Sequence, residues 1–131
     1  MRKLTLHEKI TIKGYIYRKD ALKMEKLVVA KVNIPNPGML RQIGDQLKDK
    51  LKSGIGVLFA DAGGKVSILT IVTKDITQQY HAGKIIGKVA ELVGGKGGGR
   101  PDMAMAGGKD VEKIQAAMKK VKDIIVSQNQ D

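Results

Sequence analysis

Apolar residues recur at alternate positions near the start of the chain. The even positions hold Leu4, Leu6, Ile10, Ile12 and Ile16. This alternation predicts a strand over about 8–17. A run rich in β-branched residues predicts a second strand over 27–32. Two prolines and a glycine in 33–38 predict a loop after that strand.

The spacing of apolar residues changes to that of a helix after this loop. One apolar face is formed by Leu40, Ile43, Leu47 and Leu51, which are three, four and four residues apart. Ser53 and Gly54 are expected to end this helix. Apolar runs over 55–60 and 66–73 flank the turn sequence of 61–64, so a β-hairpin is expected there.

Helical and glycine-rich sequences alternate in the C-terminal half. Apolar residues predict a helix over about 82–93. A last helix is predicted from Ile114 to Ile125, with Asp110 as its N-cap. Between the two helices, 94–109 contains seven glycines and one proline and is expected to be irregular.

Taken in order, these elements predict an α/β (α+β) fold class: a single small domain in which a mixed β-sheet of about four strands packs with three helices. The length of 131 residues fits one domain. The globular part is expected to be 27–131, with 1–26 as an N-terminal strand or linker.

The chain is strongly basic, with 24 Lys and Arg against 13 Asp and Glu and a net formal charge of +11. This balance indicates a polyanionic partner, nucleic acid first. Aromatic residues are scarce, so phosphate contacts are better supplied than stacking on unpaired bases.

Several classes of protein are excluded by composition. The absence of cysteine excludes disulfides, a thiolate zinc site and a cysteine nucleophile. No apolar run approaches the roughly 20 residues of a membrane span, and the N-terminus has no apolar signal core. We therefore expect a cytoplasmic protein with no membrane partner.

The glycine-rich segment 94–109 carries the most unusual chemistry. Consecutive glycine amides can form an anion-binding concavity, and neighbouring cations add positive charge. The candidate nucleic-acid-binding residues here are Lys96, Gly97, Gly98, Gly99, Arg100, Gly107, Gly108 and Lys109. The glycines suit tight packing between two helices and the sheet equally well, and the sequence leaves both interpretations open. The segment lacks the Gly-Lys-Ser or Gly-Lys-Thr of a nucleotide-hydrolase P-loop.

Three further residues are candidates for the same interface. His81 and Lys84 lie near the start of the second predicted helix, and Arg41 lies on the first. Two histidines without cysteine offer no metal-ligand set. No carboxylate pair or nucleophile elbow indicates catalysis. We therefore expect no catalytic residue, no metal and no cofactor.

The chain resembles a known family through its glycine-rich signature. The runs 81–90 and 94–104, followed by Ala106-Gly107-Gly108, are similar to the signature at the C-terminal end of alanyl-tRNA synthetases. That C-terminal domain is shared with DHH-type phosphoesterases. The resemblance covers about 27–127. The family usually has glutamine where this chain has Met105, so a hydrogen-bonding side chain is replaced by a thioether.

The resemblance implies a non-catalytic module of an alanine–tRNA ligase that binds tRNA, tRNA-Ala first, at the elbow where the D and T loops meet. Its other partners would be the catalytic and editing domains of the parent synthetase, and its state a monomer or weak dimer. The alternative is a stand-alone nucleic-acid- or nucleotide-binding module related to the C-terminal domain of DHH phosphoesterases. A small phosphate-handling enzyme and a dimerising interaction module are weaker hypotheses.

Overall fold

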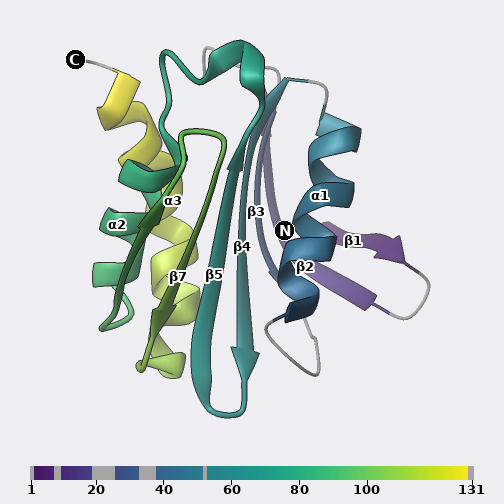
Figure 1. Ribbon diagram of the computed structural model, residues 1–131. Helices are drawn as coiled ribbons and strands as arrows, with labels where there is room; N and C mark the ends of the chain where they lie inside the picture. Colours follow the sequence, from purple (N-terminus) through teal and green to yellow (C-terminus); the bar gives the residue numbers. More distant parts are fainter. Residues whose placement is uncertain (1, 8–9, 19–25, 33–37, 52, 130–131) are drawn as a thin grey trace.

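A computed structural model of the protein describes residues 2–7, 10–18, 26–32, 38–51 and 53–129. The elements in chain order are β1 (Arg2–His7), β2 (Ile10–Arg18), β3 (Lys26–Val32), α1 (Gly38–Leu51), β4 (Gly54–Ala62), β5 (Lys65–Val72), η2 (Lys74–Ile76), α2 (Ala82–Glu91), β6 (Lys96–Gly99), β7 (Met103–Gly108), η3 (Val111–Lys113) and α3 (Ile114–Asn129). The described strands form one sheet in the spatial order β1-β2-β3-β4-β5-β7-β6 (Figure 1). Strands β3 and β4 are parallel and the other neighbouring pairs are antiparallel, so the sheet is mixed.

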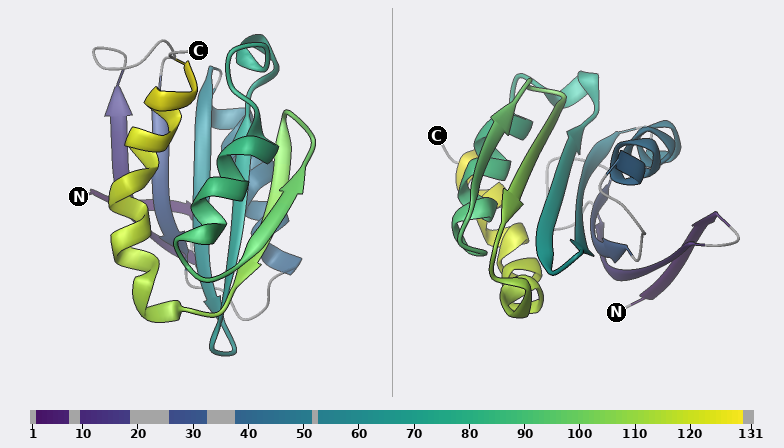
Figure 2. Two further views of the ribbon diagram at one scale, coloured as in Figure 1. Left: turned by 90° about the vertical axis from the view of Figure 1, so that its left-hand side faces the viewer. Right: turned by 60° about the horizontal axis from the view of Figure 1, so that its bottom comes forward.

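Helices cover both faces of this sheet. Helix α1 lies on one face, and α2 and α3 lie together on the other (Figure 2). Strand β3 gives the reason. Its Leu27 and Val29 belong to the core beneath α2 and α3, whereas Val28 and Ala30 belong to the core beneath α1. Successive side chains on a strand point to opposite faces, so a continuous apolar run requires cover on both sides.

The apolar face predicted for α1 is confirmed. All four of its predicted residues are buried, namely Leu40, Ile43, Leu47 and Leu51. Gly44 lets the helix lie close to the sheet, because a Cβ at this residue would overlap the Leu69 side chain. Lys48 and Lys50 stand in the last turn, where positive charge complements the helix dipole.

The predicted β-hairpin is confirmed as β4 and β5. Its turn contains Gly63 and Gly64, with φ of 66° and 81°, values that favour glycine. The Asp61 side chain accepts a hydrogen bond from the Gly64 amide at 3.2 Å. Both strands are mostly buried, so the hairpin lies at the centre of the sheet.

The prediction that 94–109 is irregular is wrong, because this segment contains the antiparallel strands β6 and β7. Glycine weakens a strand but also lets another backbone approach closely. A Cβ on Gly97 would lie 2.5 Å from the Met105 carbonyl oxygen. The glycines therefore permit a tightly packed hairpin rather than preventing a regular one.

The sheet is consequently larger than the four strands predicted. Strands β3, β4, β5, β7 and β6 form a mixed five-strand sheet, and β2 and β1 extend it beyond β3. The strand expected over 8–17 corresponds to β2, whereas β1 was not predicted. The α/β class and the three helices are confirmed. The division between 1–26 and 27–131 stays a prediction.

Asp110 does not cap α3 as predicted. It precedes the short turn η3 and makes no side-chain capping hydrogen bond. Its Oδ2 atom instead pairs with Lys113 Nζ at 3.7 Å. The loop predicted over 33–38 lies, except for its last residue, outside the described residues. None of the described helices has an apolar stretch long enough to cross a bilayer.

Candidate nucleic-acid interface

Helix α2 begins beside the turn that joins β6 to β7. His81 is its N-cap, and the Nδ1 atom accepts a hydrogen bond from the Lys84 amide at 3.3 Å. The Ala82 amide donates to the Pro101 carbonyl oxygen at 2.8 Å. These bonds satisfy donors that the first turn of a helix leaves without internal partners. The bond from Ala82 to Pro101 also holds the start of α2 against the β6–β7 hairpin.

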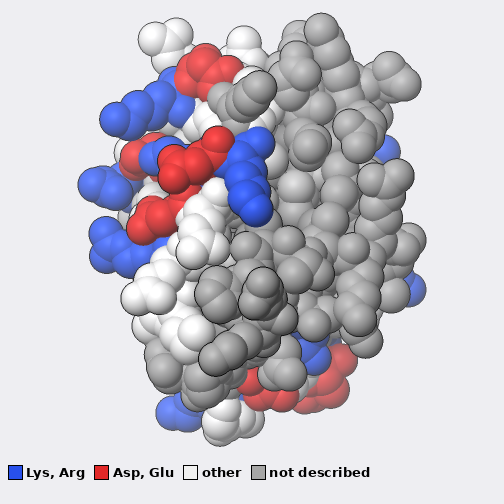
Figure 3. Space-filling model, turned by 90° about the vertical axis from the view of Figure 1, so that its right-hand side faces the viewer, with Lys and Arg blue, Asp and Glu red and all other residues white. Residues whose placement is uncertain are grey.

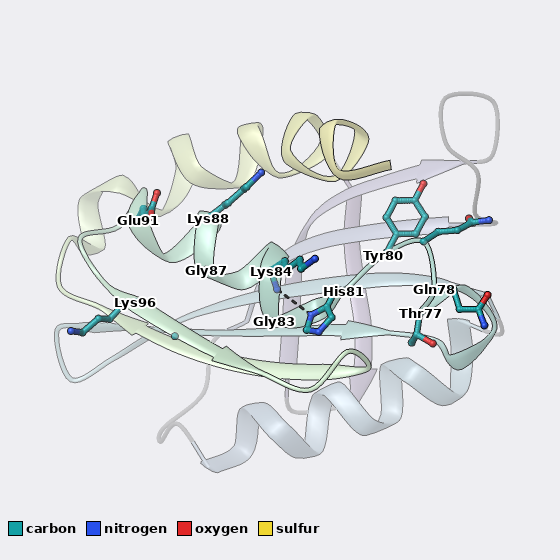
Figure 4. Close-up of a pocket in the computed structure, with 12 residues that line it drawn as sticks. Thr77, Gln78, Tyr80, His81, Gly83, Lys84, Gly87, Lys88, Glu91 and Lys96 are labelled. Atoms are coloured by element: carbon teal, nitrogen blue, oxygen red, sulfur yellow. Dashed lines mark hydrogen bonds between the residues drawn. The ribbon is translucent and has the colours of Figure 1, made fainter. Parts of the chain in front are cut away.

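A groove of about 750 Å³ runs between α2 and β6 (Figure 4). Segment 77–81 lines one end, and Lys96 lies at the other end, where β6 begins. Three lysines line the groove, namely Lys84, Lys88 and Lys96, together with one acid, Glu91. The groove therefore carries a net positive charge.

Gly83 brings the first turn of α2 close to the end of β6. A Cβ on Gly83 would lie 2.7 Å from the Gly99 carbonyl oxygen, closer than side-chain atoms approach backbone. A Cβ on Gly87, one turn later, would lie 3.9 Å from the Gly97 carbonyl oxygen, which is an ordinary contact distance. The helix and the edge strand therefore meet through backbone at the start of α2.

Asp102, in the turn between β6 and β7, forms an ion pair with helix α1 on the opposite face of the sheet. This carboxylate lies 3.2 Å from Lys48 Nζ on α1 (through Oδ2) and 3.5 Å from Arg100 Nε (through Oδ1). Its carbonyl oxygen accepts a hydrogen bond from the Val72 amide at 2.9 Å. The Arg100 side chain is 67% exposed, but its charge is partly balanced by Asp102.

The electrostatic surroundings of Asp102 lower its pKa. Burial alone would raise the pKa of this carboxyl group, because it disfavours the charged form. The hydrogen bond from Lys48 and the positive charges of Lys48 and Arg100 outweigh burial, so the net shift is downward. Asp102 is thus held ionised at neutral pH as the centre of a three-residue charge cluster.

We expect Asp102→Asn to weaken the fold at neutral pH by about 1 kcal/mol, because the pairs are part-exposed and screened. A pKa lower in the folded than in the unfolded state stabilises the fold above the unfolded value of about 3.9 and is lost as the pH falls through the folded pKa. Melting temperatures of parent and variant should therefore converge as the pH falls from 7 to 3. A constant difference across this range would contradict the assigned role of Asp102.

The structure brings together four of the residues predicted for the interface. His81, Lys84, Lys96 and Gly97 all line the α2–β6 groove. Gly98, Gly99 and Arg100 continue along β6 to its turn. Gly107 pairs with Lys96 at the other end of the hairpin, where Gly108 and Lys109 follow it, but none of the three lines the groove. Arg41 is on α1, across the sheet from the groove, so it cannot belong to the same surface.

The packing interpretation of the glycines has direct support in the structure. A Cβ on Gly108 would lie 2.6 Å from Val93 Cγ2, and one on Gly99 would lie 2.9 Å from the Ala104 Cβ. Gly98 differs, because a Cβ there would meet no atom within 4 Å. Positive charge at this site therefore comes from lysine side chains, and most of the glycines serve the close approach of backbones.

Met105, which stands at the family's usual glutamine, is 36% exposed on β7. It pairs with Leu69 on one side and Gly98 on the other. Leu69 packs in the core beneath α1, and cross-strand neighbours share a face. Met105 therefore lies on the face opposite to α2, outside the groove.

Lys88 and the segment 77–80 also line the groove, although neither was predicted from the sequence. Lys88 follows Lys84 by four residues, a spacing that places both on one side of a helix. That spacing was a usable signal. The segment 77–80 has no such sequence signal, because its position beside the groove depends on how α2 packs against the sheet.

The face that carries α1 has a different charge pattern. Its exposed residues include Arg41 and Lys50, but also Asp45 and Asp49. Figure 3 shows this side of the molecule, where blue and red side chains interleave over the described part of the surface. Among the described residues of α1, basic and acidic groups are therefore mixed, whereas lysines predominate along the groove.

No group of three or more histidine, acidic or cysteine residues suited to a metal ion occurs among the described residues. Asp102 and Asp110, two carboxylates beside the hairpin, are held in ion pairs. The exposed lysines of the groove can supply electrostatic and hydrogen-bonding recognition of an anionic ligand.

Fold and groove together define the class of this protein: a small, basic, three-layer α/β domain with a lysine-lined groove beside a glycine-rich hairpin. A family profile described as "DHHA1 domain" matches residues 24–127. The chain belongs to this DHHA1 domain family, which confirms the resemblance found in the sequence.

Two relatives of the chain with similar sequences are alanine–tRNA ligases. It is 48% identical over 100 residues to the alanine–tRNA ligase of Desulfosudis oleivorans, covering 76% of this chain and 11% of that protein. It is 50% identical over 102 residues to the ligase of Bordetella avium, covering 78% and 12% respectively. The chain thus spans about a ninth of the length of these ligases.

The fold is similar to a solved structure of the same kind. The C-Ala domain of Aquifex aeolicus alanyl-tRNA synthetase superposes with a TM-score of 0.71 at 30% sequence identity. The match covers 76% of this chain and 90% of that one. The protein is therefore homologous to the C-Ala domain of alanyl-tRNA synthetase.

Proposed function

We propose that this domain is a non-catalytic tRNA-binding module of an alanine–tRNA ligase, acting in the cytoplasm on tRNA-Ala. It contacts the tRNA, at the elbow, and supports aminoacylation and editing by other domains of the parent enzyme. By itself it is a monomer or weak dimer and performs no catalysis.

The observation that carries this proposal is the groove between α2 and β6. It gathers Lys84, Lys88 and Lys96 against a single acid, whereas the described, exposed residues of α1 mix both signs of charge. Lysine ammonium groups are well suited to phosphates, which supply most of the sequence-independent affinity of nucleic-acid complexes. Homology to the C-Ala domain of an alanyl-tRNA synthetase supports tRNA as the nucleic acid.

The elbow contact rests on the resemblance and on the geometry of the groove. An open groove rimmed by flexible lysines suits a folded backbone surface rather than a base-reading pocket. Tyr80, the aromatic residue that lines the groove, is 1% exposed and offers little surface for stacking. Recognition by shape and phosphate position is therefore the expected mode.

A salt titration tests the proposal. We expect the affinity for whole tRNA to fall by more than tenfold as salt rises from about 50 to 200 mM, because several phosphate contacts release counterions. Whole tRNA should bind more tightly than an acceptor-stem minihelix that lacks the elbow. Affinity that does not respond to salt would contradict phosphate recognition, and equal affinity for the two RNAs would contradict the elbow contact.

A further inference from the structure

A second, smaller groove adjoins the first across helix α2. It has a volume of about 340 Å³ and lies between α2 and α3. Lys88 and Leu92 line it from α2, and Lys120, Asp123 and Ile124 line it from α3. Lys88 also lines the α2–β6 groove, so one residue joins the two grooves.

The lysines of both grooves can offer their positive charge to an anionic ligand. Lys84, Lys88, Lys96 and Lys120 are exposed, and none of them forms an ion pair with a carboxylate in the part of the chain that the structure describes. Lys48, Arg100 and Lys113 differ, because each has a carboxylate within 4.0 Å. Four lysines against the two lining acids, Glu91 and Asp123, leave a balance of 4 − 2 = +2 along the joined grooves.

We propose that the two grooves form one track for the phosphate backbone of an RNA, which crosses α2 at Lys88 and ends at Lys120 on α3. This inference rests on the proposed function and extends the interface beyond the residues that the sequence indicated. We assign an RNA backbone to this track because its lysines have no carboxylate partner among the described residues and their charge is complementary to that of phosphates.

The spacing of the lysines fits this track. Lys84 and Lys88 are four residues apart, or roughly 6 Å along the axis of α2. Phosphates of one strand of a nucleic-acid helix advance by roughly 3.4 Å each along the helix axis, so two steps cover about 7 Å. Two phosphates that are two steps apart on the same strand can therefore contact both ammonium groups.

The chemistry of the second groove suits phosphate contact without base readout. Its apolar lining residues, Leu92 and Ile124, are half-buried and aliphatic, so they offer no aromatic surface for bases. Lysine binds phosphate as a flexible point charge, without the planar geometry that lets arginine read guanine. Binding along the track is thus independent of base sequence.

The experiment measures the salt dependence of tRNA affinity for single neutral variants. Lys88→Gln and Lys120→Gln should each weaken binding several-fold and reduce the slope of log affinity against log salt by about one, since each removes one phosphate contact. Lys50→Gln on α1 removes the same charge outside the track and should leave the slope unchanged. Lys88→Arg should retain the parent slope.

A gain of affinity gives an independent readout. Asp123→Asn removes an acid that lines the second groove, so binding should become several-fold tighter if RNA passes there. A purely structural role for Asp123 would not strengthen binding. Melting temperatures of all the variants establish that each is folded.

The outcomes separate this inference from the proposed function. The track is supported if the Lys88→Gln and Lys120→Gln variants have a smaller slope of log affinity against log salt and the Asp123→Asn variant binds tRNA more tightly. Parent-like slopes for Lys120→Gln and parent-like affinity for Asp123→Asn, with a salt-dependent parent, would overturn the track and leave tRNA binding intact. A parent that fails to bind tRNA would overturn both.

Discussion

Replacing Gly95 by alanine should destabilise the domain by about 3 kcal/mol or more, at the upper end of what overpacking costs. A Cβ on Gly95 would overlap the Gly107 carbonyl oxygen and lie 2.6 Å from both the Gly107 carbonyl carbon and the Gly108 Cα. These are backbone atoms, so no side-chain rotation can relieve the overlap. The Gly95 amide also donates to the Ala90 carbonyl oxygen at 2.9 Å, which ties this residue to the end of α2.

Thermal unfolding measures this effect, and a fall in melting temperature of more than about 10 °C is expected. Gly98→Ala is the matched control, because it adds the same methyl group to β6 where no atom lies within 4 Å. That variant should melt within a few degrees of the parent. Equal melting temperatures for the two variants would contradict the close backbone packing at Gly95.

Reversing two charges in the groove should abolish most of the tRNA affinity. Lys84→Glu combined with Lys96→Glu changes the net charge from +11 to +7 and places two carboxylates where phosphates would bind. Losing an exposed ionic contact costs roughly up to 1 kcal/mol, and each reversal adds repulsion. We expect a decrease in affinity of about 10- to 100-fold, since 1.4 kcal/mol corresponds to tenfold.

The matched control reverses two exposed lysines that line neither groove. Lys50→Glu combined with Lys65→Glu gives the same net charge of +7, with the changes on α1 and at the β4–β5 turn. This variant should lose much less affinity, because its charges act only at long range and are screened by salt. Equal losses in the two double variants would mean that total charge, and not the groove, determines binding.

The sequence predicted most of the elements because their apolar periodicity was clear. In α1, the four buried leucine and isoleucine residues recur with the period of a helix. In β4 and β5, two paired apolar runs have the pattern of buried strands. Strands β6 and β7 were missed because glycine carries no side chain from which a period can be recognised. Their pairing depends on close backbone contacts, such as Gly97 against Ala106 of the facing strand, and these leave no side-chain pattern in the sequence.

The candidate site was predicted only in part for a similar reason. His81, Lys84, Lys96 and Gly97 were identified from local sequence, and they share one groove. Arg41 was grouped with them because charge alone gives no information about which face of the sheet a helix covers. Lys120 was omitted because its nearness to Lys88 follows from the packing of α3 beside α2.

The structure makes Arg100 a weaker candidate for RNA contact than its sequence context predicts. Sequence alone presents it as a guanidinium free to hold a phosphate. In the folded protein it shares Asp102 with Lys48, so part of its charge is already compensated. Lys84 and Lys96, which have no such partner among the described residues, are the stronger candidates for RNA contact.

A map of backbone amide shifts on addition of tRNA tests the location of the interface most directly. For this 14.2 kDa chain, we expect the largest NMR changes in α2 and the start of β6, over 81–97, and on the side of α3 that carries Lys120. Changes concentrated on α1, over 38–51, with the amides of 81–97 unaffected, would contradict it.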